Sequence, residues 1–65
     1  MNPAPKNNDQ GKVVGARVRR IAGRTHGQEG VIVAIHGSIA GDTLITMRLD
    51  DGTEIKPYLR QVAVV

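Results

Sequence analysis

The chain has 65 residues and a formal charge of +3, with nine lysines and arginines against six acids. This length accommodates one domain and leaves no second module for a separate function. Because the sequence contains no cysteine, disulfides and thiolate metal sites are excluded. No apolar run approaches the roughly 18 residues that a membrane span needs. We therefore expect a soluble, cytoplasmic protein that makes no membrane contact.

The positive charge is unevenly distributed along the chain. The segment 12–24 contains no acid and holds five basic residues, Lys12, Arg17, Arg19, Arg20 and Arg24. From residue 25 onward three basic residues stand against five acids, a net charge of −2. A basic patch of this kind attracts polyanions, because their condensed counterions are released on binding.

The N-terminal residues differ in composition from the rest. Residues 1–11 contain two prolines and three asparagines with little apolar surface, which predicts a disordered tail before one domain over 12–65. From residue 12 onward, short apolar runs alternate with glycine-rich breaks. These runs predict strands at 13–22, 29–36, 43–50, 52–56 and 61–64. Since no window has helical periodicity, the sequence predicts an all-β fold, a small five-stranded barrel with at most one helical turn.

Two strands show their expected packing clearly. In the third strand the residues expected to face the core are Ile45, Met47 and Leu49, with Arg48 facing outward. The run 31–35 is apolar on both faces, which is typical of a strand that bends across a barrel.

The connections between strands also have signatures. Asp50-Asp51-Gly52 predicts a tight hairpin, because glycine and aspartate tolerate positive φ. Residues 37–42 are expected to form a loop that includes Ile39. Pro57 ends the fourth strand, and residues 57–60 predict a single 3₁₀ turn with Leu59 packed beneath it.

Residues 15–35, GARVRRIAGRTHGQEGVIVAI, combine a basic strand, a glycine-bounded loop and an apolar strand. Gly23 and Gly27 bracket the loop, and Gly30 permits a bulge or a close backbone approach. This arrangement resembles the KOW motif of ribosomal proteins and NusG-type elongation factors over about a third of the chain. The resemblance implies an SH3-like barrel and nucleic-acid contact through the loop at 24–26. The long basic extensions of ribosomal members are absent, so we do not expect assembly into a ribosome.

The chain also resembles the plasmid-encoded type II dihydrofolate reductase, a short SH3-like protein with a disordered tail and a GxRVR strand entry. In that family a Gln-Ile-Tyr segment lines the central pore of a tetramer. The comparable segment here reads Glu54-Ile55-Lys56-Pro57-Tyr58, so an acid replaces the amide and the tyrosine is displaced. We therefore expect no reductase activity.

The candidate nucleic-acid-binding residues are Arg17, Arg19, Arg20, Arg24 and His26, supported by Lys12, Lys56 and Arg60. Guanidinium groups suit phosphate because they offer a planar, bidentate fork. The competing interpretation is a solvated outer face, with Arg20 extended along the rim. Tyr58 is the only aromatic residue, so we expect phosphate contacts with low sequence specificity. RNA, DNA and a nucleic-acid-bound protein complex all stay open as partners.

Nothing in the sequence predicts catalysis. His26 and His36 lack the spacing of a zinc site, and the adjacent Asp50 and Asp51 are expected to be solvated turn residues. We therefore expect a non-catalytic binding module without metal or cofactor. The alternative is a module for protein interaction or homo-oligomerisation, in which the apolar strands and Ile39 form the contact surface.

Overall fold

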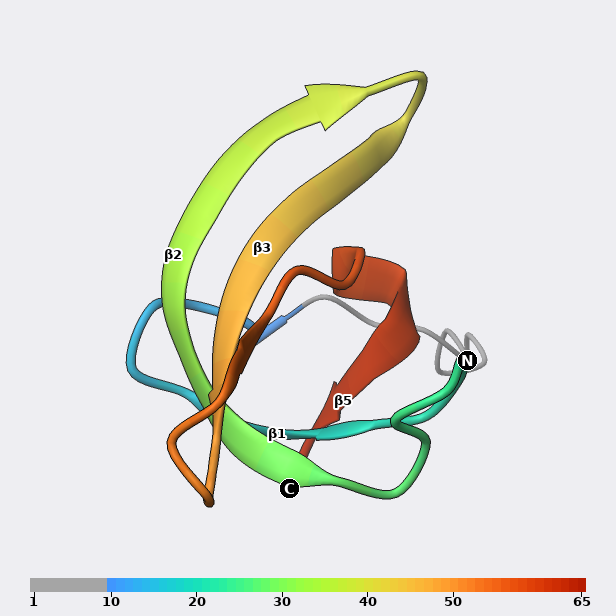
Figure 1. The fold of residues 1–65 in the computed structure, drawn as a ribbon. Helices are drawn as coiled ribbons and strands as arrows, with labels where there is room; N and C mark the ends of the chain where they lie inside the picture. Colours follow the sequence, from blue (N-terminus) through green and yellow to red (C-terminus); the bar gives the residue numbers. More distant parts are fainter. Residues whose placement is uncertain (1–9) are drawn as a thin grey trace, which may run out of the picture.

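The computed structural model describes residues 10–65 as an all-β domain (Figure 1). Its elements are β1 (Arg17–Arg20), β2 (Glu29–Ile39), β3 (Asp42–Leu49), β4 (Glu54–Ile55), the 3₁₀ turn η1 (Leu59–Gln61) and β5 (Val62–Val64). The all-β prediction is confirmed. Of the tail predicted at 1–11, residues 1–9 lie outside the described residues, and Gln10 and Gly11 form a turn. No helix in the described part is long and apolar enough to cross a membrane.

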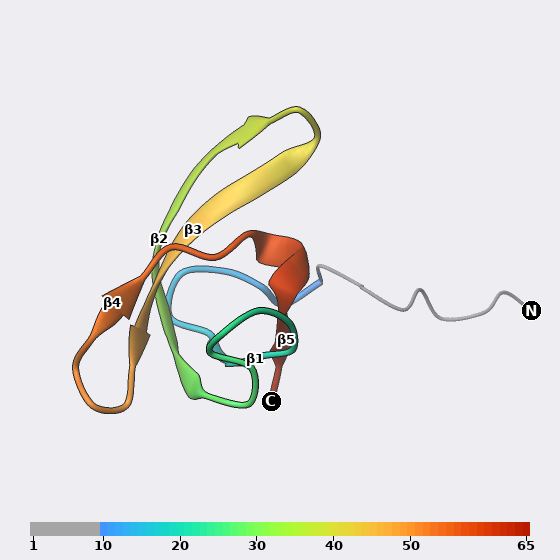
Figure 2. The ribbon, with the colours of Figure 1, turned by 45° about the vertical axis from the view of Figure 1, so that its right-hand side comes forward.

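The five strands form one antiparallel sheet in the order β4-β3-β2-β1-β5. The first four strands pair with one another in chain order. After β4 the chain crosses to the other edge of the sheet, where β5 pairs with β1. No pairing joins β4 to β5 in the described residues, so the sheet is not closed and the predicted barrel is not confirmed in that detail. Figures 1 and 2 show β2 and β3 curving together as a long hairpin that rises beyond the rest of the sheet.

A single apolar core lies against this curved sheet. Its buried side chains are Val18, Ile32, Ile45, Met47, Leu49 and Val62. Ala16, Ile55 and Leu59 pack against its edge, so η1 contributes Leu59 as the sequence predicts. The alternation expected in the third strand is confirmed, because Arg48 is exposed between two core residues.

The first strand is shorter than the predicted range 13–22. Gly15 lies in a turn at φ +96°, and Gly23 follows the strand at φ +91°. Both values belong to the left-handed region, which interrupts an extended strand and favours glycine. The regular part of β1 is therefore confined to Arg17–Arg20.

The loop predicted at 37–42 is wrong, since the chain forms a two-residue turn there. Ser38 pairs with Thr43 and Ile39 pairs with Asp42, so β2 and β3 continue to the tip of the hairpin. The turn residues Ala40 and Gly41 have φ values of +52° and +86°. Positive φ at both central residues matches the right-handed twist of the flanking strands. Glycine-rich composition predicts a break in the chain but does not give its length.

Two register shifts explain why β2 bends. They fall between Ile32 and Ala34 and between Ile35 and Ser38, where β2 has extra residues relative to β3. Such bulges bend the strand that contains them. The bend predicted from the doubly apolar run is therefore produced by irregular pairing.

Candidate functional site

Arg17 and Arg19 project from the exposed face of β1, where each meets a carboxylate. Arg19 donates to Glu29 Oε2 from Nε at 3.0 Å and from Nη2 at 2.8 Å. Arg17 donates to both oxygens of Asp50, at 3.0 and 2.7 Å, and to Glu29 Oε1 at 3.2 Å. The register accounts for this, because Arg19 lies opposite Glu29 and Arg17 lies two residues along, on the same face of the strand.

The same face continues onto β3 and β4, where Arg48 donates to Glu54 Oε2 at 2.8 Å. We call this surface the outer charged face; it consists of Arg17, Arg19, Arg48, Glu29, Asp50 and Glu54. Three guanidinium groups and three carboxylates give it a net charge of zero. A neutral mosaic produces little field at a distance, so this face does not by itself attract a polyanion.

The ion pairs shift the ionisation of their members. Hydrogen bonding to Arg19 lowers the pKa of Glu29, with a smaller effect from Arg17. Hydrogen bonding to Arg17 lowers the pKa of Asp50, and the same contact raises the pKa of Arg17. Arg17, Arg19 and Asp50 are well exposed and Glu29 is partly exposed, so the pairs are screened by solvent and each stabilises the fold only weakly.

Two of the predicted site residues are buried. Lys12 is 5% exposed and its Nζ donates to Leu59 O at 3.3 Å. Arg20 is 8% exposed and its Nη2 donates to Ala22 O. Arg20 alternates inward with the core residue Val18, so it is not extended along the rim as the sequence suggested. Neither side chain offers an exposed cation.

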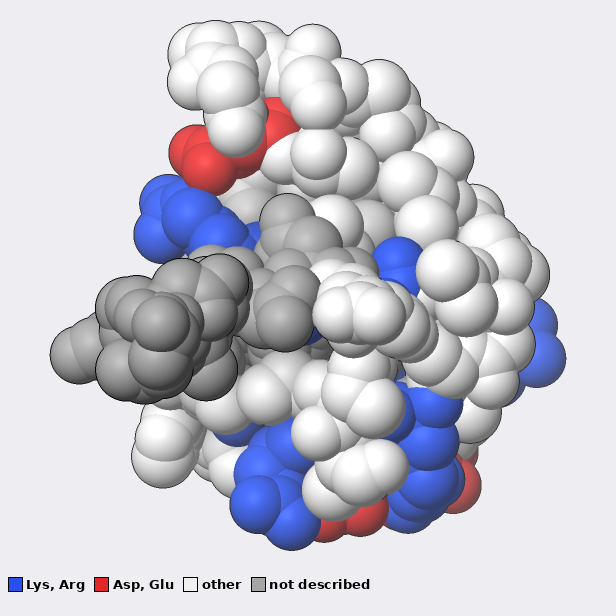
Figure 3. All heavy atoms as spheres, turned by 180° about the vertical axis from the view of Figure 1, so that it is seen from behind, with Lys and Arg blue, Asp and Glu red and all other residues white. Residues whose placement is uncertain are grey.

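Arg60 and Tyr58 lie together at η1. Arg60 Nε donates to Asp42 Oδ1 at 2.8 Å, and Arg60 Cζ lies 5.5 Å from the centroid of the Tyr58 ring. Figure 3 shows Lys and Arg side chains in separate groups on this side of the molecule, several of them with Asp or Glu side chains beside them. The predicted basic residues therefore do not form one continuous positive wall.

The loop between β1 and β2 is different, because residues 21–28 contain no acid. Arg24 and His26 are exposed in it, and within residues 10–65 Arg24 forms no salt bridge. Backbone hydrogen bonds hold the loop in shape: Gly27 N donates to Arg20 O at 2.7 Å, and Gln28 N donates to Thr25 O at 3.0 Å. The loop therefore presents Arg24 and His26, two residues apart, on an exposed segment without acids.

Lys56 is exposed and also forms no ion pair within the described part of the chain. It follows β4, which is at the opposite end of the sheet order from β5. The β1–β2 loop is attached on the β5 side, since Ile21 N donates to Gln61 O at 2.8 Å. Lys56 is thus not part of the cluster formed by the loop.

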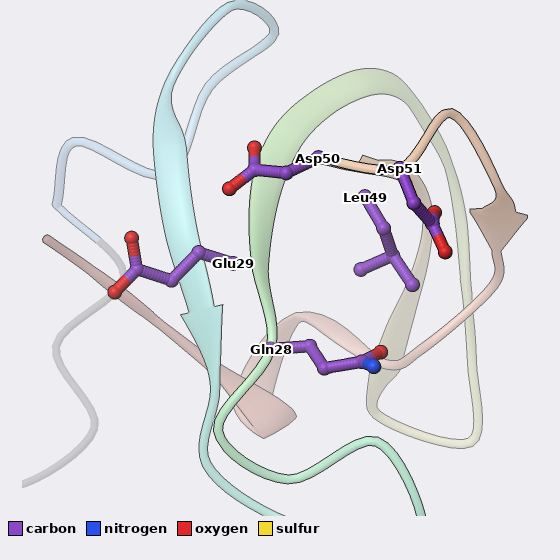
Figure 4. Close-up of a pocket in the computed structure, with 5 residues that line it drawn as sticks. All are labelled: Gln28, Glu29, Leu49, Asp50 and Asp51. Atoms are coloured by element: carbon purple, nitrogen blue, oxygen red, sulfur yellow. The ribbon is translucent and has the colours of Figure 1, made fainter.

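An acidic pocket of about 260 Å³ adjoins the outer charged face, lined by Gln28, Glu29, Leu49, Asp50 and Asp51 (Figure 4). In Figure 4 the carboxylates of Glu29 and Asp50 point towards β1, while Gln28, Leu49 and Asp51 point the other way. Sequence reasoning missed this pocket, because its two sides come from segments about twenty residues apart. The pairing of β2 with β3 brings them together, and Asp50 N donates to Glu29 O at 3.2 Å.

The sequence matches no known protein family and no curated protein. The resemblances to the KOW motif and to the type II reductase therefore remain interpretations of the residues. Function has to be argued from the geometry of the loop, the outer charged face and the exposed apolar residues.

Proposed function

We propose that this chain is a non-catalytic module that binds RNA or DNA through the loop 21–28. The supporting observation is that Arg24 is an exposed cation in an acid-free loop and forms no salt bridge within residues 10–65. An arginine of this kind is open to phosphate oxygens, because its planar guanidinium can donate two parallel hydrogen bonds to them. His26 lies two residues away in the same loop and is also exposed.

The proposal moves the contact surface from the β1 strand to the loop that follows it. Arg17 and Arg19 are engaged by Glu29 and Asp50, and their face is electrically neutral. Phosphate can compete with exposed ion pairs, because such pairs are weak. The first encounter with a polyanion nevertheless favours the surface where positive charge is unopposed.

The fold is compatible with the proposed module. An antiparallel sheet of five strands, with β5 paired to β1, is compatible with the small barrel that the KOW resemblance implies, although the sheet is not closed. The KOW resemblance implies contact through the loop between the first two strands, which is where the unopposed arginine lies. Fold-level similarity of this sort supports a function only as an analogy.

The direct test is an amide NMR titration with short RNA and DNA, in single-stranded and duplex form, at low salt. We expect chemical-shift changes concentrated in residues 21–28, weakened in Arg24→Gln and retained in the control Arg48→Gln. The control removes one exposed arginine of the outer charged face. The absence of shifts, or shifts centred on Arg48 and its neighbours, would count against the proposal.

A second candidate function, homo-oligomerisation or protein interaction, is favoured by the β2–β3 hairpin. Ile39 is 68% exposed and Ile35 is 42% exposed, so both leave apolar surface in contact with solvent on one strand. A two-stranded hairpin is also marginally stable by itself and gains from being covered. Sedimentation equilibrium tests this candidate: a concentration-dependent dimer that Ile39→Ser dissociates supports it, and a monomer at all concentrations excludes homo-oligomers.

A further inference from the structure

The β2–β3 hairpin has a long free edge on the side of β2 that faces β1. The last contacts along this edge are made by Ile32, whose N–H donates to Ala16 O at 3.0 Å and whose carbonyl accepts from Gly15 N at 2.8 Å. From residue 33 to residue 39, no strand or loop of the described chain pairs with it. Figures 1 and 2 show this part of the hairpin extending away from β1.

The backbone of Ile35 and Ser38 points toward this free edge. Ile45 N donates to Pro57 O on the far side of β3, so Ile45 and the opposite Ile35 share no hydrogen bond. Ile39 flanks the two-residue turn in the hydrogen-bonded pair that closes the hairpin, so the next pair, with Ser38, again points outward. Each of these two residues therefore presents an N–H and a carbonyl to a further strand.

This edge lacks most of the features that prevent exposed edges from pairing. β4 and β5 also have free edges, but these strands contain only two and three residues, and Lys56 and Pro57 follow β4. Short length, charge and proline are common ways to protect an edge. Residues 30–41 contain no acid, lysine, arginine or proline. Register shifts are the protection that β2 does have, and they bend the strand without shortening it.

The apolar core also stops short of this edge. Ile45 is completely buried, whereas Ile35, which lies opposite it on the same face, is 42% exposed. A strand added beside β2 would continue the sheet past Ile35 and cover it. The free backbone groups and the exposed apolar side chain thus call for the same partner, an extended and uncharged strand.

Charge distinguishes among the candidate partners. Residues 30–41 offer no lysine or arginine to a nucleic acid or to an anionic membrane. The chain itself carries an uncharged strand of the required kind, and two-fold symmetry lets each copy cover the edge of the other. The positive loop at 21–28 does not oppose this contact, because it lies in the lower half of the molecule in Figures 1 and 2, whereas the hairpin tip is at the top.

We propose that residues 33–39 of β2 pair in antiparallel fashion with the same residues of a second copy of this chain. The product is a sheet in the order β3-β2-β2-β3 across a two-fold axis, in which both β2 strands become inner strands. Such pairing stabilises the hairpins, because three or more strands hold together better than two. The inference rests on the second candidate function, to which it gives a partner and a contact, and not on nucleic-acid binding.

Amide hydrogen exchange, measured by NMR at low and high protein concentration, tests this pairing. We expect the amides of Ile35 and Ser38 to exchange rapidly in the monomer and about tenfold or more slowly in the dimer. Val64 is the matched control: Val65 N donates to Arg17 O, so the N–H of Val64 points away from β1 to the free edge of β5. Exchange at Val64 should not depend on concentration.

Ser38→Pro tests the same contact by removing an outward N–H. Proline is tolerated at an edge position whose N–H faces solvent, so the monomer should still fold. Sedimentation should show dimerisation weakened by about tenfold or more, because the donor is lost from both copies. Ser38→Ala is the matched control. It loses only the hydroxyl, whose hydrogen bond with Thr43 Oγ1 at 2.9 Å lies within the hairpin, and it should dimerise as the wild type does.

Three results would overturn the inference. They are a monomer at every concentration, a dimer in which the Ile35 and Ser38 amides exchange as fast as in the monomer, and equal dimerisation of Ser38→Pro and Ser38→Ala. The first would leave the edge to a strand of another protein, and the second would leave a dimer held by side chains alone. If Ser38→Pro does not fold, the exchange rates of the wild type decide the question.

A parallel titration with an oligonucleotide separates this inference from the proposed function. A dimer with protected Ile35 and Ser38 amides but no oligonucleotide response would overturn nucleic-acid binding and leave the pairing of β2 in place. A monomer whose loop responds to the oligonucleotide would overturn the pairing and leave nucleic-acid binding in place.

Discussion

Gly30 allows the backbones of two neighbouring strands, β2 and β3, to approach each other closely. It lies opposite Leu49 in the pairing of β2 with β3, and a Cβ added there would overlap the backbone carbonyl of Arg48. The sequence predicted a bulge or a close backbone approach at this glycine, and the close approach is confirmed. The sequence did not predict that β3 is the strand that approaches Gly30, because strand pairing is decided by the assembly of the whole sheet.

Gly30→Ala should therefore destabilise the protein by about 1–3 kcal/mol, since the backbone of β3 must move to make room. Urea denaturation measures the change. Gly37→Ala is the matched control in the same strand, because a Cβ at Gly37 meets no atom within 4 Å. Equal stability of the two variants would show that the approach at Gly30 is not restrictive.

At the tip of the β2–β3 hairpin, a single substitution should stabilise the protein. Ala40 adopts φ +52°, which is unfavourable for a residue with a Cβ. Ala40→Asn creates an Asn-Gly turn and should stabilise the protein by up to about 1 kcal/mol. Ala40→Val should destabilise it, because a branched side chain tolerates positive φ poorly. Thermal unfolding compares the two variants with the wild type. A melting temperature that falls from Ala40→Asn to wild type to Ala40→Val supports the assigned turn, and the reverse order contradicts it.

At the scale of elements, alternation along β1 predicted that Arg17 and Arg19 share one exposed face. It did not predict their partners. Arg19 meets Glu29 because β1 and β2 pair in a particular register, and Arg17 reaches Asp50 because β3 follows β2 in the sheet. Arg20 shows a related limit: alternation places it on the same face as Val18, but it does not say that a charged side chain at a strand end is buried there. The periodicity of a strand predicts which side chains share a face. The contacts between side chains of neighbouring strands depend on how the strands pair in the sheet.

The outer charged face predicts how stability depends on pH. The pKa values of Glu29 and Asp50 are below their ordinary values of 4.5 and 3.8, because Arg19 and Arg17 stabilise the carboxylates. A lowered folded-state pKa means that this contribution is complete above about pH 4.5 and is lost as the pH falls through the lowered values. Unfolding followed against pH should show a small, salt-sensitive decline on the acid side.

Arg17→Met tests the origin of that decline. The variant removes the hydrogen bonds to Asp50 and the weaker contact to Glu29, so the acid-side decline should become shallower. Arg24→Gln is the control, because Arg24 is outside every ion pair of the described residues. If the control changes the pH dependence as much as Arg17→Met does, the pairs are not its cause.

At the scale of the molecule, one small core supports the sheet, the hairpin and the loop. Its buried side chains come from β1, β2, β3 and β5, so the sequence-distant ends of the domain stabilise each other. The sequence identified the core positions of the third strand from alternation alone. It missed the extension of the β2–β3 hairpin, because a single isoleucine between Gly37 and Gly41 gives residues 37–42 the composition of a loop.

Truncation in this core should have a large effect. Ile32 is fully buried, and Ile32→Ala is expected to cost about 2–5 kcal/mol, a substantial part of the stability of so small a domain. Ile39→Ala, at an exposed position of the same strand, should change stability by less than about 0.5 kcal/mol in the monomer. Chemical denaturation at low protein concentration compares the two. Similar losses for both would place Ile39 in a buried contact.

The salt dependence of nucleic-acid affinity tests the central claim most directly. Fluorescence anisotropy with a short oligonucleotide, repeated over a range of salt concentrations, gives the slope of log K against log salt. The account predicts a clearly negative slope that Arg24→Gln reduces by about one and Arg48→Gln leaves unchanged. A flat salt response in the wild type, or equal slopes for wild type and Arg24→Gln, would contradict binding through the β1–β2 loop.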